Sequence, residues 1–168
     1  NPDLISRNYM VPAIMGVLLL ATTTLVSSMA LVKEREEGTM EQLIVTPLHP
    51  WEIMIGKLLP FALIGLVGVT LALQVVLFVF HAPMQGSILL FYGVTCLFLI
   101  STLGLGLLIS TLAHTQQQAM LIATFFVMMP FVMLSGFIFP VENMPPVMQK
   151  VAALLPLKYY LECVRGIF

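Results

Sequence analysis

The strongest constraint on the fold is an uncharged run of 84 residues, Leu58 to Val141, that contains no Asp, Glu, Lys or Arg. Only 9% of the 168 residues are charged and 60% are hydrophobic, whereas about a quarter of the residues in a soluble domain are charged. Because so long a run cannot form the surface of a water-soluble domain, the composition excludes that class. The sequence predicts an integral membrane protein.

The length of the uncharged run limits how many times it can cross a membrane. A helix needs about 20 apolar residues to cross a hydrocarbon core about 30 Å thick, so the run has room for three crossings with short turns. A further apolar run lies before the main cluster of charges. We predict spans at residues 10–32, 58–80, 88–112 and 119–139, and the start of another at 158–168. The predicted fold class is an all-α, polytopic membrane helix bundle, a single transmembrane domain over residues 1–168.

The charged segment between the first two spans is KEREEGTMEQLIVTPLHPWE, residues 33–52, which carries seven of the charged residues. One charge at the centre of a bilayer costs about 2.5 to 3.5 kcal/mol on insertion scales, so the segment must lie at a membrane surface. Thr39 and Gln42 fit a capping box, and Glu41 falls in the first turn, where the helix dipole favours an anion. We predict a short amphipathic helix from Thr39 and a second helix from His49.

Two interpretations of this segment remain open on the residues alone. One is a solvated loop with two well-capped helix starts. The other is a rigid docking element that offers acidic and apolar groups to a partner at the membrane surface. Lys and Arg are equally numerous on the two predicted sides of the membrane, so the positive-inside rule does not orient the chain.

Polar side chains within the predicted spans are candidates for lining a pathway, because such groups are costly in a membrane. We name Gln74, Ser101 and Pro130 as candidate pathway or gate residues. Pro130 lacks a backbone N–H and predicts a kink in its span. Hydroxyl groups can bond back to their own helix, so Gln74 is a stronger candidate than Ser101.

One helix face in the uncharged run is made of small residues. Thr102, Gly106 and Ser110 are spaced four residues apart. Such faces allow helix backbones to approach closely in lipid. Ordinary helix packing therefore explains this face better than a substrate role.

The segment from Phe139 to Pro156 differs from the spans, because it holds four prolines, one Glu and one Lys. Its apolar residues nevertheless keep a helical spacing, Asn143 can cap a helix, and a proline can occupy the first turn. We predict a short amphipathic helix within an extracytoplasmic re-entrant segment, residues 140–157, that helps to close the exit of a pathway. Glu142 is a candidate gate residue, with a simple helix-start charge as the alternative.

Several functions find little support in the residues. The net charge of −1 gives no footprint for nucleic acid, and the two cysteines form neither a metal pattern nor a disulfide framework. Gly56 and Lys57 lack the upstream Gly and the following Ser or Thr of a phosphate loop. A membrane-embedded enzyme would need convergent acids, histidines or metal ligands. We therefore predict no catalytic residue, no metal site and no cofactor in this chain.

Two motifs resemble those of a known family, the type-2 ABC exporter permeases. EREEGTMEQLIVTPLHPWEIMIGK, residues 34–57, resembles the cytoplasmic segment after that family's second span, in which E-R-E-x-G-T-x-E-x-L precedes T-P and a helix ending in G-K. PFVMLSGFIFPVENMPPVMQKVAALLPLKYYLECVRGI, residues 130–167, is similar to the family's pattern of L-S-G, a Pro, M-P, a Gln, P-L-x-Y and a later Arg-Gly. With the spans between them, the resemblance covers nearly the whole chain.

The resemblance implies the permease subunit of an ATP-driven exporter in the bacterial inner membrane, with ATP and Mg bound by a separate ABC ATPase subunit. Its other implied partners are a second permease copy or paralogue, membrane lipid and a periplasmic adaptor. Residues 33–57 would form the cytoplasmic coupling segment. The ATPase-coupling residues within it would be Arg35, Glu36, Glu37, Gly38, Thr39, Glu41, Gln42, Leu43 and Ile44. Of the family's six spans, the chain would carry the second to the fifth and the start of the sixth.

The substrate class follows from the character of the spans. Uncharged, apolar spans suit a drug, a lipid or another amphiphile better than a highly charged solute. The alternative function is a membrane scaffold outside the ABC family or a secondary transporter. Ion coupling usually leaves an ionisable residue within a span, and the four predicted spans contain none.

Overall fold

The structure, a computed structural model, describes residues 2–81 and 85–168, and every regular element in these ranges is helical. Four helices in the described ranges are long and apolar enough to cross a membrane: Met10–Glu36, Pro50–Phe78, Ile88–Leu112 and Gln116–Leu134. The prediction of an all-α chain with four such helices is therefore confirmed.

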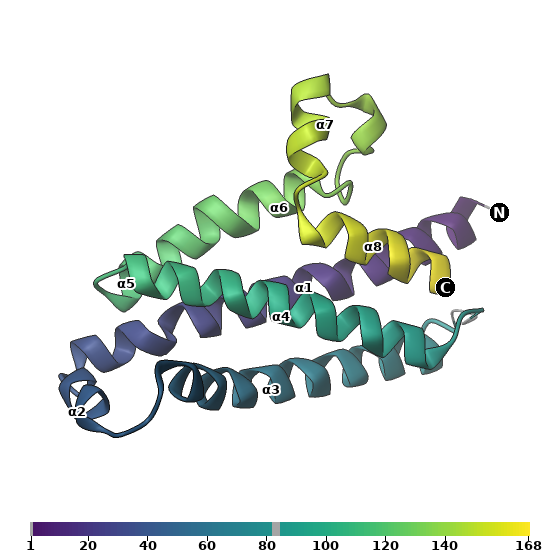
Figure 1. Ribbon diagram of the computed structural model, residues 1–168. Helices are drawn as coiled ribbons and strands as arrows, with labels where there is room; N and C mark the ends of the chain where they lie inside the picture. The colour runs from purple at the N-terminus through teal and green to yellow at the C-terminus, as the bar shows by residue number, and fades with distance from the viewer. Residues whose placement is uncertain (1, 82–84) are drawn as a thin grey trace.

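Helix α1 (Pro2–Glu36) is the centre of the bundle (Figure 1). It contacts α3 (Pro50–Phe78), α4 (Ile88–Leu112), α5 (Gln116–Ile122), α8 (Pro156–Ile167) and the π-helical turn η1 (Ala123–Met128). The short α2 (Met40–Val45) lies where α1 gives way to α3, and the turn between α4 and α5 lies at the same end of the bundle (Figure 1). We call this the α2 end.

The small-residue face of α4 packs directly against α1. A Cβ atom placed on Gly106 would overlap the hydroxyl of Ser27, so only glycine permits this approach. Thr23 Oγ1 donates a hydrogen bond to Thr102 Oγ1 at 3.0 Å, and Ser110 Oγ accepts one from a backbone N–H of α1 at 2.9 Å. These hydrogen bonds satisfy hydroxyl groups that lipid could not. The face is a packing surface, as the residue spacing suggested.

The helix boundaries follow local chemistry more closely than hydropathy. α4 covers the same residues as the span expected at 88–112. α3 begins at Pro50, where the second helix of the charged segment was predicted to start, because a proline suits the first helical position and the Glu52 carboxylate accepts a hydrogen bond from the His49 N–H at 2.9 Å. The second helix of the charged segment thus runs directly into the span.

The fourth candidate span consists of α5, the π-helical turn η1 (Ala123–Met128) and α6 (Met129–Leu134). The Met129 N–H bonds to the carbonyl of Thr124, five residues back, immediately before Pro130. Proline in a helix both removes a donor and clashes with the preceding turn. The expected interruption of the hydrogen-bond ladder therefore takes the form of a wider turn, as π-bulges commonly do.

After α6 the chain forms the turn η2 (Val141–Asn143) and then α7 (Pro146–Ala152), which projects to one side of the bundle (Figure 1). The prediction that Asn143 caps this helix was wrong. Asn143 ends η2, while Pro145 takes the N-cap position and Pro146 the first helical position. Met144 and Pro145 each precede a proline and have extended backbones, with ψ 153° and 149°, so the helix begins only at Pro146.

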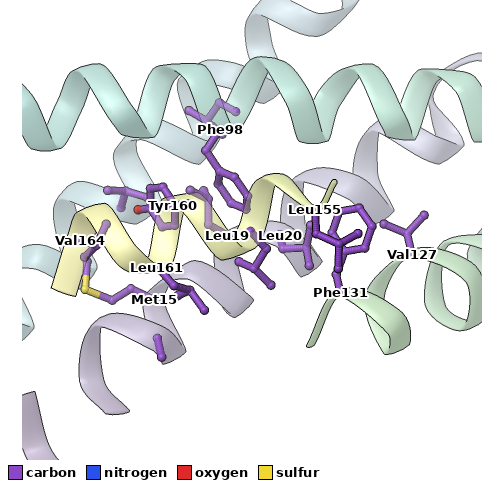
Figure 2. Packing of buried hydrophobic residues seen from close by; sticks show 14 of the residues in the cluster. Met15, Leu19, Leu20, Phe98, Val127, Phe131, Leu155, Tyr160, Leu161 and Val164 are labelled. Atoms are coloured by element: carbon purple, nitrogen blue, oxygen red, sulfur yellow. The ribbon is translucent and has the colours of Figure 1, made fainter. Parts of the chain in front are cut away.

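Helix α8 is amphipathic and lays its apolar face on α1 and α4. Figure 2 shows Tyr160 and Leu161 packed among Phe98, Leu19 and Met15, and the rings of Phe98 and Tyr160 stack with centroids 4.4 Å apart. The buried apolar residues of α8 are Leu157, Tyr160, Leu161, Val164 and Ile167. This face packs α8 against the middle of α4 and against the part of α4 that lies farthest from the α2 end.

The direction of α8 differs from that expected of a span returning toward the α2 end. Near its start, Tyr160 Oη lies 3.4 Å from Thr95 Oγ1, and after its last turn the Phe168 ring lies 6.4 Å from that of Phe91. The carbonyl of Ile167 accepts backbone hydrogen bonds from Gln85 and Gly86, both at 2.9 Å. α8 therefore runs antiparallel to α4, toward the connection between α3 and α4 and away from the α2 end.

Candidate functional site

The predicted coupling residues lie at the α2 end, where α1 turns into α2. The turn is made at Gly38, whose φ of 71° is in the left-handed region that favours glycine. The Thr39 N–H closes it by donating to the Glu34 carbonyl at 3.0 Å. α2 is thus joined to α1 by three residues in a tight turn, rather than by an extended loop.

The predicted capping box at the start of α2 was wrong. Thr39 has helical dihedral angles, φ −82° and ψ −7°, and its side chain makes no capping hydrogen bond. Its hydroxyl instead donates to the Glu34 carbonyl at 3.4 Å. Side-chain capping needs a non-helical backbone at the N-cap residue. Because the Gly38 turn enters α2 directly from α1, Thr39 remains in the helical region and cannot cap.

The surface of α2 has a half-buried side and an exposed side. Met40 and Leu43 are half-buried and line a groove shared with α1 and α3. Glu41 and Gln42 are exposed, together with Ile44 at 75% and Val45 at 84%. Exposed apolar side chains continue beyond α2 at Leu48, Trp51, Met54 and Ile55. The exposed side is thus an apolar surface beside an acidic residue.

Two of the predicted coupling residues bind the turn between α4 and α5. Arg35 Nη1 donates to the carbonyls of Thr111 at 3.3 Å and Ala113 at 3.2 Å. The Glu36 carboxylate accepts from the Gln116 backbone N–H at 3.0 Å and from its side-chain amide at 2.5 Å. The cation thus lies at a helix C-terminus and the anion at a helix N-terminus, as the helix dipoles favour.

An ion pair joins the same turn of α1 to α3. Glu34 pairs with Lys57, and the two side chains are 25% and 16% exposed. Glu37 pairs only loosely with Lys33, at 3.9 Å between two side chains that are more than half exposed. Sequence reasoning did not select Glu34 and Lys57 as functional residues. Their opposite charges at the two ends of one coupling segment are the signal that could have found them.

The four candidate pathway or gate residues lie on separate elements. Gln74 is exposed on α3, Pro130 is half-buried in α6, and Glu142 is exposed in η2. Ser101 Oγ donates to the Leu97 carbonyl at 3.0 Å, as a hydroxyl bonding back to its own helix does. Ser101 also lines a groove of about 270 Å³ between α4 and α8. The structure does not gather these four residues at one site.

Glu142 belongs to a different group of charges. It lines an open hollow of about 600 Å³ with Lys158, Glu162 and Arg165, three residues that form a polar stripe along α8. Lys158 Nζ lies 3.8 Å from Glu162 Oε1, and Arg165 Nη2 donates to the Gly136 carbonyl at 3.4 Å. Sequence reasoning selected Glu142 alone. The helical spacing of the other three charges is the signal it missed.

Comparisons with known proteins identify the family of the chain. Residues 3–168 match the family model described as ABC-2 type transporter. The chain belongs to this family. Over all 168 residues it is 36% identical to the probable multidrug ABC transporter permease YbhR of Escherichia coli K12 and 34% identical to YbhS of the same strain. Over 140 residues it is 36% identical to the inner membrane transport permease YhhJ of that strain.

The comparisons also set limits on what can be transferred. The chain spans 45% of the length of YbhR and of YbhS, while the YhhJ match covers 82% of the chain and 37% of that permease. No solved structure matches the chain. The predicted family is confirmed, and the chain is a multi-pass membrane component of the ABC-2 permease type.

Proposed function

We propose that this ABC-2 chain belongs to the permease subunit of an ATP-driven exporter in a bacterial inner membrane, and that a separate ABC ATPase docks on α2. The observation that carries the proposal is the exposed side of α2, which follows the last turn of α1, where polar contacts join α1 to α3, α4 and α5. ATP and Mg would bind in the ATPase, with no cofactor in this chain.

The exposed side of α2 fits a partner better than it fits water. Ile44 and Val45 are exposed apolar residues of α2, and the exposed Glu41 is three and four residues before them on the same helix. Contiguous exposed apolar surface commonly marks a protein interface. A partner surface with an apolar groove and a basic rim would cover both groups, whereas a solvated loop would leave Ile44 and Val45 without a role.

A charge reversal on α2 tests the docking proposal. In the full-length permease expressed with its ATPase, Glu41→Lys should reduce co-purification of the ATPase, because it places a cation against a basic rim. Glu142→Lys makes the same charge change on an exposed residue in η2 and should leave co-purification at the unaltered level. Equal ATPase recovery from the two variants would favour the solvated-loop interpretation.

The wider assembly follows from the family and from the relatives. Two permease copies, or one copy and a paralogue, would form the pathway between them within membrane lipid, and a periplasmic adaptor would extend it. YbhR and YbhS carry multidrug in their names. Together with the uncharged candidate spans, this supports a drug, a lipid or another amphiphile as substrate. Stimulation of ATP hydrolysis by a panel of such compounds in reconstituted vesicles would identify the class.

Residues 140–157 would lie in the outer leaflet as a re-entrant segment that gates the exit. Val147 and Leu154 are 73% and 83% exposed in α7 and just after it, an apolar surface that lipid would cover. α8 then begins beside Ser101, partway along α4. Depth-dependent quenching of a fluorophore at Val151 in the reconstituted full-length protein should show shallow burial. A fluorophore fully accessible to water would contradict the re-entrant placement.

A further inference from the structure

The last turn of α1 makes contacts that docking on α2 does not require. Arg35 and Glu36 bond to the turn between α4 and α5, on a part of the chain nearly 80 residues away. A surface that served docking alone would present its charges to the partner. Arg35 and Glu36 instead form hydrogen bonds with the α4–α5 turn of the same chain.

The contacts hold both sides of that turn at once. The carbonyls of Thr111 and Ala113, which receive the Arg35 hydrogen bonds, are at the end of α4. Gln116, which donates two hydrogen bonds to Glu36, is the first residue of α5. The last turn of α1 therefore forms hydrogen bonds with the end of α4 and with the beginning of α5, which belong to two successive candidate spans.

The α4–α5 turn is stabilised by its own hydrogen bonds. A force on the turn would therefore move the helices rather than unfold the turn. Thr115 Oγ1 accepts a hydrogen bond from the Gln118 N–H at 3.1 Å, and Gln118 Oε1 accepts one from the His114 N–H at 2.9 Å. Both bonds satisfy backbone donors that have no partner within α5. Displacement of Gln116 would therefore carry α5 and the following turn η1 with it.

The connection to α2 is equally short. Only three residues separate Glu36 from Met40, and the Gly38 N–H donates to the Arg35 carbonyl at 3.3 Å. We propose that Arg35 and Glu36 are positioning residues that transmit a displacement of α2 to the α4–α5 turn and so to the span containing η1. This proposal rests on the docking of an ATPase on α2, because that event supplies the displacement.

A second charged pair, at the end of α1 and in the turn that follows it, serves as a control. Glu37 and Lys33 carry the same charges as Glu36 and Arg35, but they pair with each other at 3.9 Å, with side chains 55% and 61% exposed. Exposed pairs of this kind contribute little to stability. Lys33→Ala therefore removes a charge and the exposed pair from the end of α1 without touching the α4–α5 turn, and Lys33 is not among the predicted coupling residues.

The test places one nitroxide spin label on each side of the proposed contact, in the full-length permease with its ATPase. Cys96 and Cys163 are first replaced by Ser, and labels are then attached in separate samples to Gln42→Cys on α2 and to His114→Cys in the α4–α5 turn. Both residues are exposed. Trapping the ATPase with Mg·ATP and vanadate should change the spectra of both labels in the otherwise unaltered complex.

Glu36→Ala should leave the response at Gln42 intact and remove most of the response at His114. Lys33→Ala should preserve both responses. Glu36→Gln should give an intermediate response at His114, because its amide oxygen still accepts the Gln116 N–H without carrying a charge. Gln116→Ala should act like Glu36→Gln, because it removes the 2.5 Å side-chain contact from the other partner and leaves α1 and α2 unaltered.

The two labels separate failure of the transmission from failure of docking. A full response at His114 in both Glu36→Ala and Gln116→Ala would overturn the proposed role of Glu36 while leaving docking on α2 in place. A silent Gln42 label in the unaltered complex would overturn docking on α2, and the transmission with it. If Glu36→Ala alone loses assembly with the ATPase, the response of Gln116→Ala decides the outcome.

Discussion

The α2 end and the α8 stripe hold their charged side chains in different ways. At the α2 end, Glu34 reaches α3, Arg35 reaches the end of α4, and Glu36 reaches the start of α5. Along α8, by contrast, Lys158 and Glu162 pair within one helix at 3.8 Å and face an open hollow. The contacts at the α2 end connect several helices to one another, whereas the charges of the α8 stripe surround an open hollow.

The difference teaches which region can move as a unit. A contact between elements far apart in sequence restrains their relative positions, while a pair four residues apart on one helix restrains only that helix and contributes about 0.3 to 0.5 kcal/mol. We therefore expect the α2 end to transmit motion rigidly. In the α8 stripe, Arg165 reaches the Gly136 carbonyl, but the Lys158–Glu162 pair lies within one helix, so we expect that pair to restrain its surroundings less.

The largest expected effect concerns the sides of the membrane on which the two regions lie. Three candidate spans separate Glu37 from Asn143. In the full-length protein without native cysteines, Glu37→Cys should react with a membrane-impermeant maleimide from the cytoplasm and Asn143→Cys from the opposite side. Reaction of both from one side would show that the two regions are not inner and outer ends of one bundle.

The second prediction concerns the α1–α4 interface, on which both regions depend. Gly106→Val should greatly lower the yield of folded protein, because any Cβ there overlaps Ser27, and overpacking typically costs about 1 to 3 kcal/mol or more. Gly104→Val is the control, since nothing lies within 4 Å of a Cβ at that position. Thermal denaturation in detergent measures the difference, and equal melting of the two variants would contradict the close packing.

Much of the fold could be predicted because membrane helices leave plain signals in sequence. The uncharged run and the small-residue spacing of Thr102, Gly106 and Ser110 predicted the helices and the face on which α4 packs. In hydrocarbon every backbone group must be hydrogen-bonded within the protein, which a helix achieves within one segment, so a long apolar run predicts a membrane-spanning helix.

The rest could not be predicted because it depends on contacts between distant segments. The bonds from Arg35 to Thr111 and from Glu36 to Gln116 join residues that no local pattern relates. The direction of α8 likewise follows from its apolar face meeting α1 and α4. Local capping motifs also failed at two helix starts. Thr39 has a helical backbone and does not cap α2, and Pro145 rather than Asn143 takes the N-cap position of α7.

The third prediction compares one ion pair from each region. Replacing Lys57 by Met removes a partner of Glu34 at a site where both side chains are mostly buried, and hydrogen bonds to charged groups contribute about 1.5 to 3 kcal/mol. Replacing Lys158 by Met breaks only the pair within α8, whose Glu162 side chain is 57% exposed. Lys57→Met should therefore lower the melting temperature clearly more than Lys158→Met. The reverse order would mean that the α8 stripe is the more rigid region.

The smallest expected effect tests whether the Thr39 side chain contributes to the stability of α2 at the α2 end. The Thr39 side chain does not cap α2. Thr39→Ala should therefore lower the free energy of unfolding by much less than the loss of a capping side chain does, which is about 0.5 to 2 kcal/mol. Glu52→Ala should cost more, about 0.5 to 1.5 kcal/mol, because it removes the 2.9 Å hydrogen bond to the His49 N–H at the start of α3. Differential scanning calorimetry of the two variants orders them. A larger loss for Thr39→Ala would mean that the threonine does cap α2, and that the Gly38 turn opens rather than joining α2 rigidly to α1.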